Sequence, residues 1–238
     1  MKQIILNEQR PNLIVPIVEA DLQDTLSVIT LANQSAADVI ELRIDYWKNL
    51  RELTPDTFHL INETSELPII LTWRTSTEGG KKIYDKTLYE QIYINAIKSG
   101  IEAVDIEYRL FYEVERLIDF AKSNKTKVIG SYHNFIETPS DLKNIISAID
   151  RSRADIVKVA VMPQIKNDVT RVLKLTKSVV KPAIVISMGQ LGNVSRYKGI
   201  KFGSKFTFGT LGKLSAPGQP TIEELNRYFL EENHEKIK

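Results

Sequence analysis

Short apolar runs rich in β-branched residues recur along the chain and alternate with longer amphipathic segments. A run of four to eight such residues is typical of a strand buried on both faces. The runs that predict strands are LIVPIVE (13–19), VIELRID (39–45), PIILTWR (68–74), AVDIEYR (103–109), KVIGSYH (127–133), DIVKVAVM (155–162), AIVISMG (183–189) and KFTFG (205–209). We therefore expect eight strands.

Between these runs, apolar residues recur at spacings of three and four, which predicts helices. The clearest examples are DLQDTLSVITLANQ (21–34), KTLYEQIYINAIKSG (86–100), FYEVERLIDFAKSN (111–124) and TPSDLKNIISAIDRSR (138–153). Cap-like residues stand at several expected helix starts, namely Asp21, Thr54 ahead of Pro55, and Ser140.

This alternation predicts parallel βαβ units with helices outside the sheet, an α/β fold. Eight units in 238 residues match a single-domain (β/α)8 TIM-type barrel over residues 1–238. The alternative is an open doubly wound sheet, but no G-x-G-x-x-G follows the first strand and no Walker A motif occurs. Residues 1–12 are too few for a domain, and we expect them to form a small hairpin or plug.

Composition narrows the function classes. Lys and Arg number 32 against 30 Asp and Glu, a net charge of +2, which argues against a nucleic-acid or membrane-surface binder. The chain has no cysteine, which excludes disulfides and thiolate sites. Asn7 to Arg10 interrupt any signal-peptide core, and no stretch approaches 18 apolar residues. A cytoplasmic protein is therefore the default expectation.

The expected strand ends are polar, and in a barrel of this kind the active site lies at the carboxyl ends of the strands. A shared pocket accounts for these residues more simply than separate buried exceptions do. They are Glu41, Arg43, Arg74, Asp105, Glu107, His133 and, within the sixth strand, Lys158.

Strand alternation sorts the faces of the fifth and sixth strands. Val157, Val159 and Val161 share the face that packs under helices, which turns Lys158 into the barrel. The same parity places His133 inward on the neighbouring strand. Because adjacent strands lie about 4.8 Å apart, we expect His133 and Lys158 to share one cavity.

An inward lysine suggests covalent chemistry. With an ordinary pKa of about 10.4, lysine is almost wholly protonated at pH 7 and is a poor nucleophile. Apolar burial and neighbouring cations favour the neutral amine, and we expect Arg43, Arg74 and Arg196 to supply those cations. The implied reaction is Schiff-base formation with a carbonyl. The alternative is a core ion pair of Lys158 with Asp105 or Glu107.

His133 is one of three histidines, and His59 and His234 are expected in solvent. Its position at a strand end suits proton transfer, although a hydrogen-bonded core histidine is the alternative. With one suitable histidine and no cysteine, we expect no zinc site. Two loops add polar groups to this set: TSTEGGKK (75–82), which carries Glu78, and SAPGQP (215–220). The alternative for the first is an ordinary solvated loop, and for the second a turn before the last helix.

From about residue 13 to residue 225 the sequence resembles the type I 3-dehydroquinate dehydratases, the Schiff-base class of the shikimate pathway of aromatic amino-acid biosynthesis. Each motif alone is modest evidence, but their order and spacing are specific. The motifs are ELR (41–43), TWRTSTEGG (72–80), SYHNF (131–135), KVAVMP (158–163), SR (195–196), FGS (202–204) and SAPGQ (215–219).

The resemblance implies a role for each matching residue. Lys158 would form the imine, His133 would be the general acid and base, and Glu78 would orient His133 with support from Asp105. The remaining matches would bind substrate: Glu41, Arg43 and Arg74 at the ring hydroxyls, Arg196, Ser215 and Gln219 at the carboxylate, and Met188 and Phe208 as pocket walls. The sequence departs from the family at the first strand, where Pro16 and Ile17 replace a serine that often touches substrate.

The implied reaction is the dehydration of 3-dehydroquinate to 3-dehydroshikimate by a homodimeric lyase that needs no metal, nucleotide or flavin cofactor. One rival is a class I aldolase, because the glycines of FGTLGK (208–213) could cradle a phosphate at the last strand. The other rival is a barrel that binds or assembles without catalysis.

Overall fold

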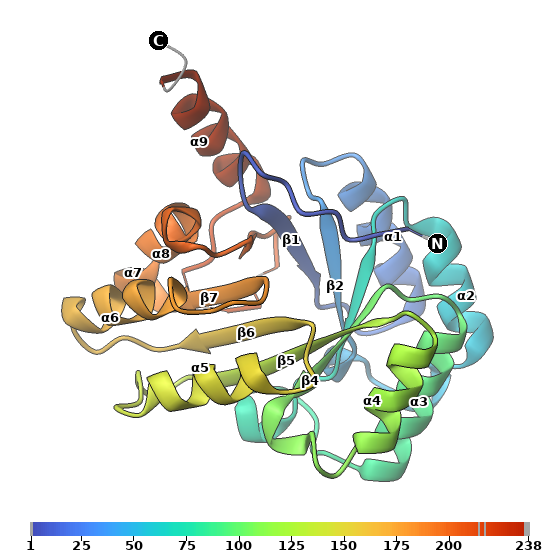
Figure 1. Ribbon diagram of the computed structural model, residues 1–238. Helices are drawn as coiled ribbons and strands as arrows, with labels where there is room; N and C mark the ends of the chain where they lie inside the picture. Colours follow the sequence, from blue (N-terminus) through green and yellow to red (C-terminus); the bar gives the residue numbers. More distant parts are fainter. Residues whose placement is uncertain (1, 214, 217, 236–238) are drawn as a thin grey trace.

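In the computed structural model, eight parallel strands curve into a barrel with helices around its outside (Figure 1). The structure describes residues 2–213, 215–216 and 218–235, with side chains to residue 232. The strands are β1 (Asn12–Ile17), β2 (Val39–Arg43), β3 (Ile69–Thr72), β4 (Ala103–Glu107), β5 (Lys127–Asn134), β6 (Ile156–Val161), β7 (Ala183–Ser187) and β8 (Phe206–Phe208). The expected fold class is confirmed.

The strands are hydrogen-bonded in sequence order from β1 to β7, and β8 returns to pair with β1. Between β7 and β8 the sheet is bridged at Ala183, whose carbonyl accepts a 2.8 Å hydrogen bond from the Lys205 N–H. All eight carboxyl ends therefore point to one end of the barrel.

The α-helices follow the strands as predicted. They are α1 (Leu22–Asn33), α2 (Pro55–Thr64), α3 (Lys86–Lys98), α4 (Glu115–Ser123), α5 (Leu142–Arg151), α6 (Lys166–Thr176), α7 (Gly189–Gly192), α8 (Val194–Lys198) and α9 (Ile222–Glu235). Asp21 and Thr54 cap α1 and α2 as expected. Ser140 does not cap α5, because a turn precedes that helix and Asp141 occupies the N-cap without a side-chain hydrogen bond.

Several strands end earlier than the apolar runs suggest. The second was expected to reach Asp45 and the fourth Arg109, yet short 3-10 turns begin at Ile44 and Tyr108. The 3-10 turns are η1 (Ile44–Tyr46), η2 (Leu50–Glu52), η3 (Ser76–Glu78), η4 (Tyr108–Leu110) and η5 (Gly199–Phe202). A tight turn there lets the chain leave the barrel rim, and it keeps the side chains of β2 and β4 at the mouth.

Two apolar layers fix the direction of each strand side chain. Val157, Val159 and Val161 of β6 pack beneath α5 and α6, as predicted. The opposite faces of the strands fill the barrel with an inner cluster made of Ile14, Val39, Ile70, Ala103, Ile129, Ile156, Ala160, Ile184, Ile186, Met188, Phe206 and Phe208. These inner residues fill the amino-terminal end of the barrel and its β6–β8 side. The carboxyl end on the other side is left to polar side chains.

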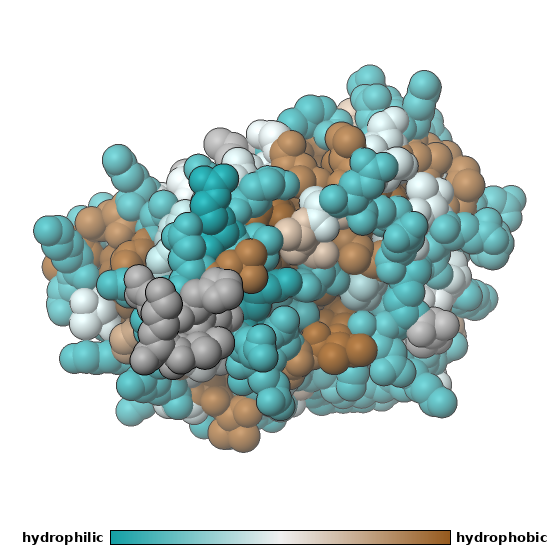
Figure 2. All heavy atoms as spheres, turned by 90° about the horizontal axis from the view of Figure 1, so that it is seen from above, coloured by the Kyte–Doolittle hydropathy of each residue, from teal (hydrophilic) through white to brown (hydrophobic). Residues whose placement is uncertain are grey.

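Residues 2–11 contain neither helix nor strand, so they form no hairpin. Ile4 instead packs against the inner cluster, and Asn12 Nδ2 donates to the Ile5 carbonyl at 2.8 Å. Polar side chains predominate on the face shown in Figure 2, with separate apolar patches between them. Within the described part of the chain, no helix is both long and apolar enough to cross a membrane.

Candidate active site

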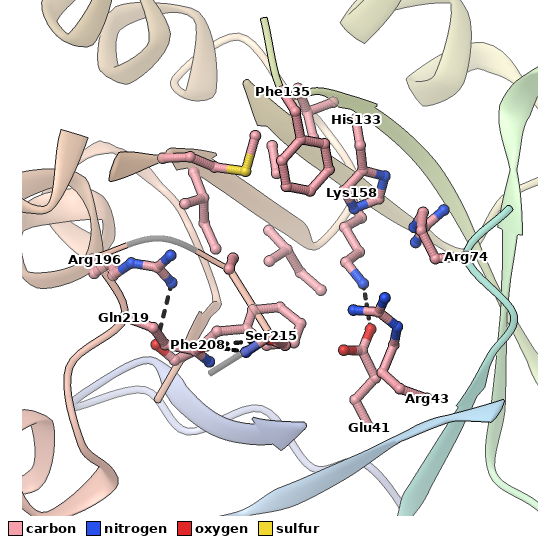
Figure 3. A pocket seen from close by; sticks show the side chains of 16 residues that line it. Glu41, Arg43, Arg74, His133, Phe135, Lys158, Arg196, Phe208, Ser215 and Gln219 are labelled. Carbon is pink, nitrogen blue, oxygen red and sulfur yellow. Dashed lines mark hydrogen bonds and ion pairs between the residues drawn. The ribbon is translucent and has the colours of Figure 1, made fainter. Parts of the chain in front are cut away.

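A pocket of about 530 Å³, counted with its opening to solvent, lies at the carboxyl end of the barrel (Figure 3). Its size suits a small-molecule ligand. The lining residues are Glu41, Arg43, Arg74, His133, Phe135, Lys158, Val159, Ala160, Ile184, Ile186, Met188, Arg196, Phe208, Ser215, Ala216 and Gln219. The pocket thus gathers the predicted substrate-binding residues together with the predicted lysine and histidine, and Glu78 and Asp105 lie behind this lining, bonded to its members.

Lys158 enters the pocket from the middle of β6 and is 5% exposed. Its Nζ lies 2.5 Å from Glu41 Oε1 and 2.8 Å from Asp105 Oδ2. The same nitrogen stands 4.9 Å from the centre of the Phe208 ring. A buried ammonium requires such partners, since an uncompensated charge at this depth costs several kcal/mol.

The charged groups bonded to Lys158 are carboxylates rather than the arginines expected from the sequence. The ion pair considered as the alternative is therefore present at Asp105, joined by Glu41, but absent at Glu107. Glu107 instead binds Arg74 and Arg109. These ion pairs leave the amine accessible to a ligand, because Lys158 still lines the open pocket.

His133 is held by a carboxylate. Glu78, on the turn that follows β3, places Oε2 at 2.9 Å from the backbone N–H of His133 and at 3.0 Å from its Nδ1. When Glu78 is ionised, its carboxylate favours the imidazole tautomer with hydrogen on Nδ1. The other ring nitrogen, Nε2, then carries the lone pair that a general base needs.

Burial dominates the titration of this pair. It raises the pKa of Glu78 to about 8, against an opposing effect of Arg74 and with reinforcement from Glu107. Burial, followed by the charges of Arg74 and Lys158, lowers the pKa of His133 well below its usual 6.5. The two groups therefore titrate as one unit that holds one shared proton near neutrality.

Arg74, which follows β3, and Asp105, on β4, form an ion pair behind the pocket lining. Arg74 Nη2 lies 2.8 Å from Asp105 Oδ1, and the Ser131 hydroxyl donates to the same oxygen at 2.6 Å. Burial alone would raise the pKa of Asp105, but the charges of Arg74 and Lys158 outweigh it and hold that pKa below its ordinary value. Asp105 therefore stays ionised and joins the two cations.

The remaining cations differ in their pairing. Arg43 makes a two-point ion pair with Asp45, through Nε at 2.8 Å and Nη2 at 2.9 Å. Arg196 is 2% exposed and donates to the Phe208 carbonyl at 3.2 Å, and it makes no ion pair with any of the described residues. Burial lowers the pKa of Arg196 to about 10. Arg196 is thus a buried charge available to an anionic ligand.

Ser215 and Gln219 complete this side of the pocket (Figure 3). The Ser215 hydroxyl is 3.1 Å from Gln219 Oε1, and Gln219 Nε2 donates to the Gly209 carbonyl at 2.9 Å. Ser215 and Gln219, which follow β8, therefore lie in the same pocket as Arg196. Met188 and Phe208 line the pocket as apolar side chains.

Some residues of the site were not singled out from the sequence. Phe135 lines the pocket, and Ser131 bridges Arg74 and Asp105. Strand alternation, which turns Ser131 to the same face as His133 two residues along, was the available signal. Pro16 does not line this pocket but a separate depression, and Ile17 belongs to the outer core.

The other histidines lie elsewhere. His59 pairs with Glu63 on the exposed face of α2. The side chain of His234 lies outside the described residues. Over the part of the chain that the structure describes, no group of three His, Cys, Asp or Glu residues is arranged to hold a metal ion.

Residues 13–235 match the family model described as type I 3-dehydroquinase. The chain belongs to this family. The 3-dehydroquinate dehydratase of Enterococcus faecalis is 34% identical over 244 residues, which cover 96% of this chain and 95% of that protein. That of Clostridioides difficile is 33% identical over 239 residues, covering 95% and 93%. Membership makes the chain an enzyme of the lyase class.

Solved structures agree with this assignment. The type I 3-dehydroquinate dehydratase of Clostridium difficile, determined with covalently modified comenic acid, matches with a TM-score of 0.89 at 30% identity over 98% of this chain and 96% of that chain. The Enterococcus faecalis structure matches with a TM-score of 0.86 at 30% identity over 96% of each chain.

Proposed function

We propose that this chain dehydrates 3-dehydroquinate to 3-dehydroshikimate through an imine on Lys158, with His133 as the general acid and base. One observation carries the proposal: a lysine amine and a histidine held by a carboxylate face the same pocket as a buried arginine that has no carboxylate partner among the described residues. Such a pocket suits a small ketone that carries an acidic group.

The lysine begins the reaction. Lys158 must lose a proton before it attacks, and Glu41, 2.5 Å from Nζ, is the adjacent acceptor. Attack on the C3 ketone then releases water and forms the iminium, which acidifies the C2 proton. Asp105 is kept ionised by Arg74 and Lys158, so we assign it to holding those two side chains in place.

The histidine carries the proton between the two halves of the elimination. His133 removes the C2 proton through Nε2, while Glu78 stabilises the imidazolium that forms. Collapse of the resulting enamine expels the C1 hydroxyl, and His133 returns its proton to that leaving group as water. Hydrolysis of the imine consumes one water and frees Lys158, so the net loss is one water molecule.

The arginines and the β8 loop would bind the rest of the substrate. Arg196, with Ser215 and Gln219 beside it, is assigned to the substrate carboxylate, because a guanidinium binds a carboxylate through two parallel hydrogen bonds. Glu41, Arg43 and Arg74 lie on the opposite side and are assigned to the ring hydroxyls. The covalent ligand in the Clostridium difficile relative supports covalent chemistry in a pocket of this family.

The aldolase rival needs a phosphate cradle in the loop after β8, and the loop does not favour one. The Gly209 N–H donates to the Ile14 carbonyl and the Thr210 N–H donates to the Pro220 carbonyl. The Gly212 N–H donates to the Thr210 hydroxyl. These backbone donors are already used within the protein, so they are not free to bind phosphate oxygens.

The proposal is tested by an ultraviolet assay on purified protein. Dehydration produces a conjugated enone, so absorbance should rise on addition of 3-dehydroquinate, and it should rise equally with EDTA present. No absorbance change with 3-dehydroquinate, together with aldehyde release from a phosphorylated sugar, would favour the aldolase. Activity abolished by EDTA would contradict a mechanism that needs no metal.

A homodimer is also proposed, on the family resemblance, and the cytoplasm is proposed as the default location. Light scattering during size-exclusion chromatography should give the mass of two chains, and a concentration-independent mass of one chain would contradict the dimer.

A further inference from the structure

Glu107 lies behind the active site and is fully buried at the carboxyl end of β4. It does not line the pocket, and it makes no bond to Lys158 or His133. A buried carboxylate with no contact to the ligand space needs a structural or positional reason, because burying its charge is costly.

Its two oxygens hold the start of the loop that carries Glu78. Oε1 accepts the Thr75 N–H at 2.7 Å, and Oε2 accepts the Thr75 hydroxyl at 2.9 Å. Arg109 closes the arrangement, with Nε 2.9 Å from Glu107 Oε2 and Nη2 2.7 Å from the Thr75 hydroxyl. We call Glu107, Thr75 and Arg109 the clamp.

Thr75 in turn fixes the turn that presents Glu78. The Thr75 carbonyl accepts the Glu78 N–H at 3.0 Å and the Gly80 N–H at 2.8 Å. Only Ser76 and Thr77 separate Thr75 from Glu78 along the chain, so we expect a displacement of Thr75 to move Glu78 as well. Glu107 also reaches Arg74 Nη1, at 3.3 Å, on the other side.

We propose that Glu107, acting with Arg109 through Thr75, is a positioning residue that sets the distance between Glu78 and His133 for proton transfer. This inference rests on the proposed function. Lys158 makes no bond to the clamp, because its partners are Glu41 and Asp105. A change at Thr75 leaves in place the contacts that run from Glu107 through Arg74 to Asp105. Loss of the clamp should therefore impair elimination and leave imine formation intact.

The most direct variants change the hydroxyl of Thr75. Thr75→Val keeps the shape and the backbone N–H but removes the bonds to Glu107 Oε2 and Arg109, whereas Thr75→Ser keeps the hydroxyl. We expect kcat to fall about 10- to 100-fold in Thr75→Val, the cost of small misplacement of a catalytic group, with KM nearly unchanged. Thr75→Ser should retain near-normal kcat.

Glu107→Gln adds a readout that a purely structural role would not move. We expect kcat/KM to rise with pH as Glu78 loses its proton, which gives the pH profile a rising limb near pH 8. The negative charge of Glu107 contributes to the raised pKa of Glu78, so its removal should shift this rising limb to lower pH. The matched control is Glu102→Gln. Glu102 is also buried and accepts a backbone N–H, that of Ile69 at 2.7 Å, but just before β4 begins. That variant should change stability without moving the limb.

Borohydride trapping of the substrate imine separates this inference from the proposed function. The inference requires Thr75→Val to trap ligand on Lys158 as wild type does while turning over more slowly. Equal kcat in Thr75→Val and Thr75→Ser, or the same pH profile in Glu107→Gln and wild type, would overturn it. If wild type neither turns over nor traps ligand, the proposed function itself fails. Should Glu107→Gln not fold, the two Thr75 variants decide the question.

Discussion

Glu78 Oε2 contacts both the backbone N–H and the Nδ1 of His133, at 2.9 Å and 3.0 Å. One carboxylate oxygen thus fixes the position of the strand end and the orientation of the imidazole. Because the pair is buried and shares a proton, its protonation state should govern both activity and stability.

Glu78→Gln should change the pH dependence of catalysis. In wild type, the pair loses its shared proton as pH rises through about 8, so the form with a free Nε2 and an ionised Glu78 accumulates and kcat/KM should rise there. Without the carboxyl group, the rise should move to the lower pKa of His133 and the plateau kcat should fall about 10- to 100-fold. Steady-state rates measured from pH 5 to about pH 10 test this, and an unchanged limb would refute it.

The same substitution should improve stability at neutral and higher pH. The folded-state pKa of Glu78 is raised from 4.5 to about 8, so between these values the folded state binds more protons than the unfolded state. The contribution of Glu78 to the free energy of unfolding therefore falls as pH rises through this window. In urea titrations, the free energy of unfolding of Glu78→Gln should increase relative to that of wild type as pH rises. A stability difference that is constant or shrinks with pH would contradict this.

His133→Ala should separate imine formation from elimination. Lys158 keeps its carboxylate partners in this variant, so borohydride with 3-dehydroquinate should still fix ligand mass on the protein. Turnover should fall at least about 100-fold, the usual contribution of a general acid and base. If trapping is lost in a folded His133→Ala protein, His133 is needed to make the imine.

Arg196→Met should weaken substrate binding with little loss of stability. Arg196 is buried and bonds the Phe208 carbonyl, so an apolar side chain of similar length removes a desolvated charge without leaving a buried carboxylate unpaired. Loss of a charged hydrogen bond to the substrate carboxylate should raise KM about 10- to 100-fold. Thermal unfolding provides the control, and an unchanged KM would remove Arg196 from carboxylate binding.

The barrel and the inward direction of Lys158 and His133 follow from local pattern. Eight apolar runs separated by helical periodicity predict the fold, and a period of two fixes which side of β5 and β6 each residue faces. The ends of the strands were predicted less accurately, since Asp45 and Arg109 lie in 3-10 turns. The pattern of apolar residues continues through such turns, so it does not show where the hydrogen bonds between neighbouring strands stop.

The partners within the site could not be predicted in the same way. Glu41 and Lys158 are 117 residues apart in sequence, and their contact depends on barrel closure and on side-chain length. The bond from Glu78 to the His133 backbone depends on a loop, whose course the clamp at Glu107 fixes. The sequence analysis placed arginines near the amine and kept a pair of Lys158 with Asp105 or Glu107 as the alternative. Compensation of a buried cation selected Asp105 and added Glu41, which had been assigned to substrate.

The central claim is that Lys158 is the residue that bonds covalently to substrate. Wild-type protein incubated with 3-dehydroquinate and borohydride should gain ligand mass on Lys158, located by mass spectrometry of its peptides. Lys158→Ala should gain none and should lose turnover. Equal labelling of Lys158→Ala, or near-normal turnover by it, would contradict the account.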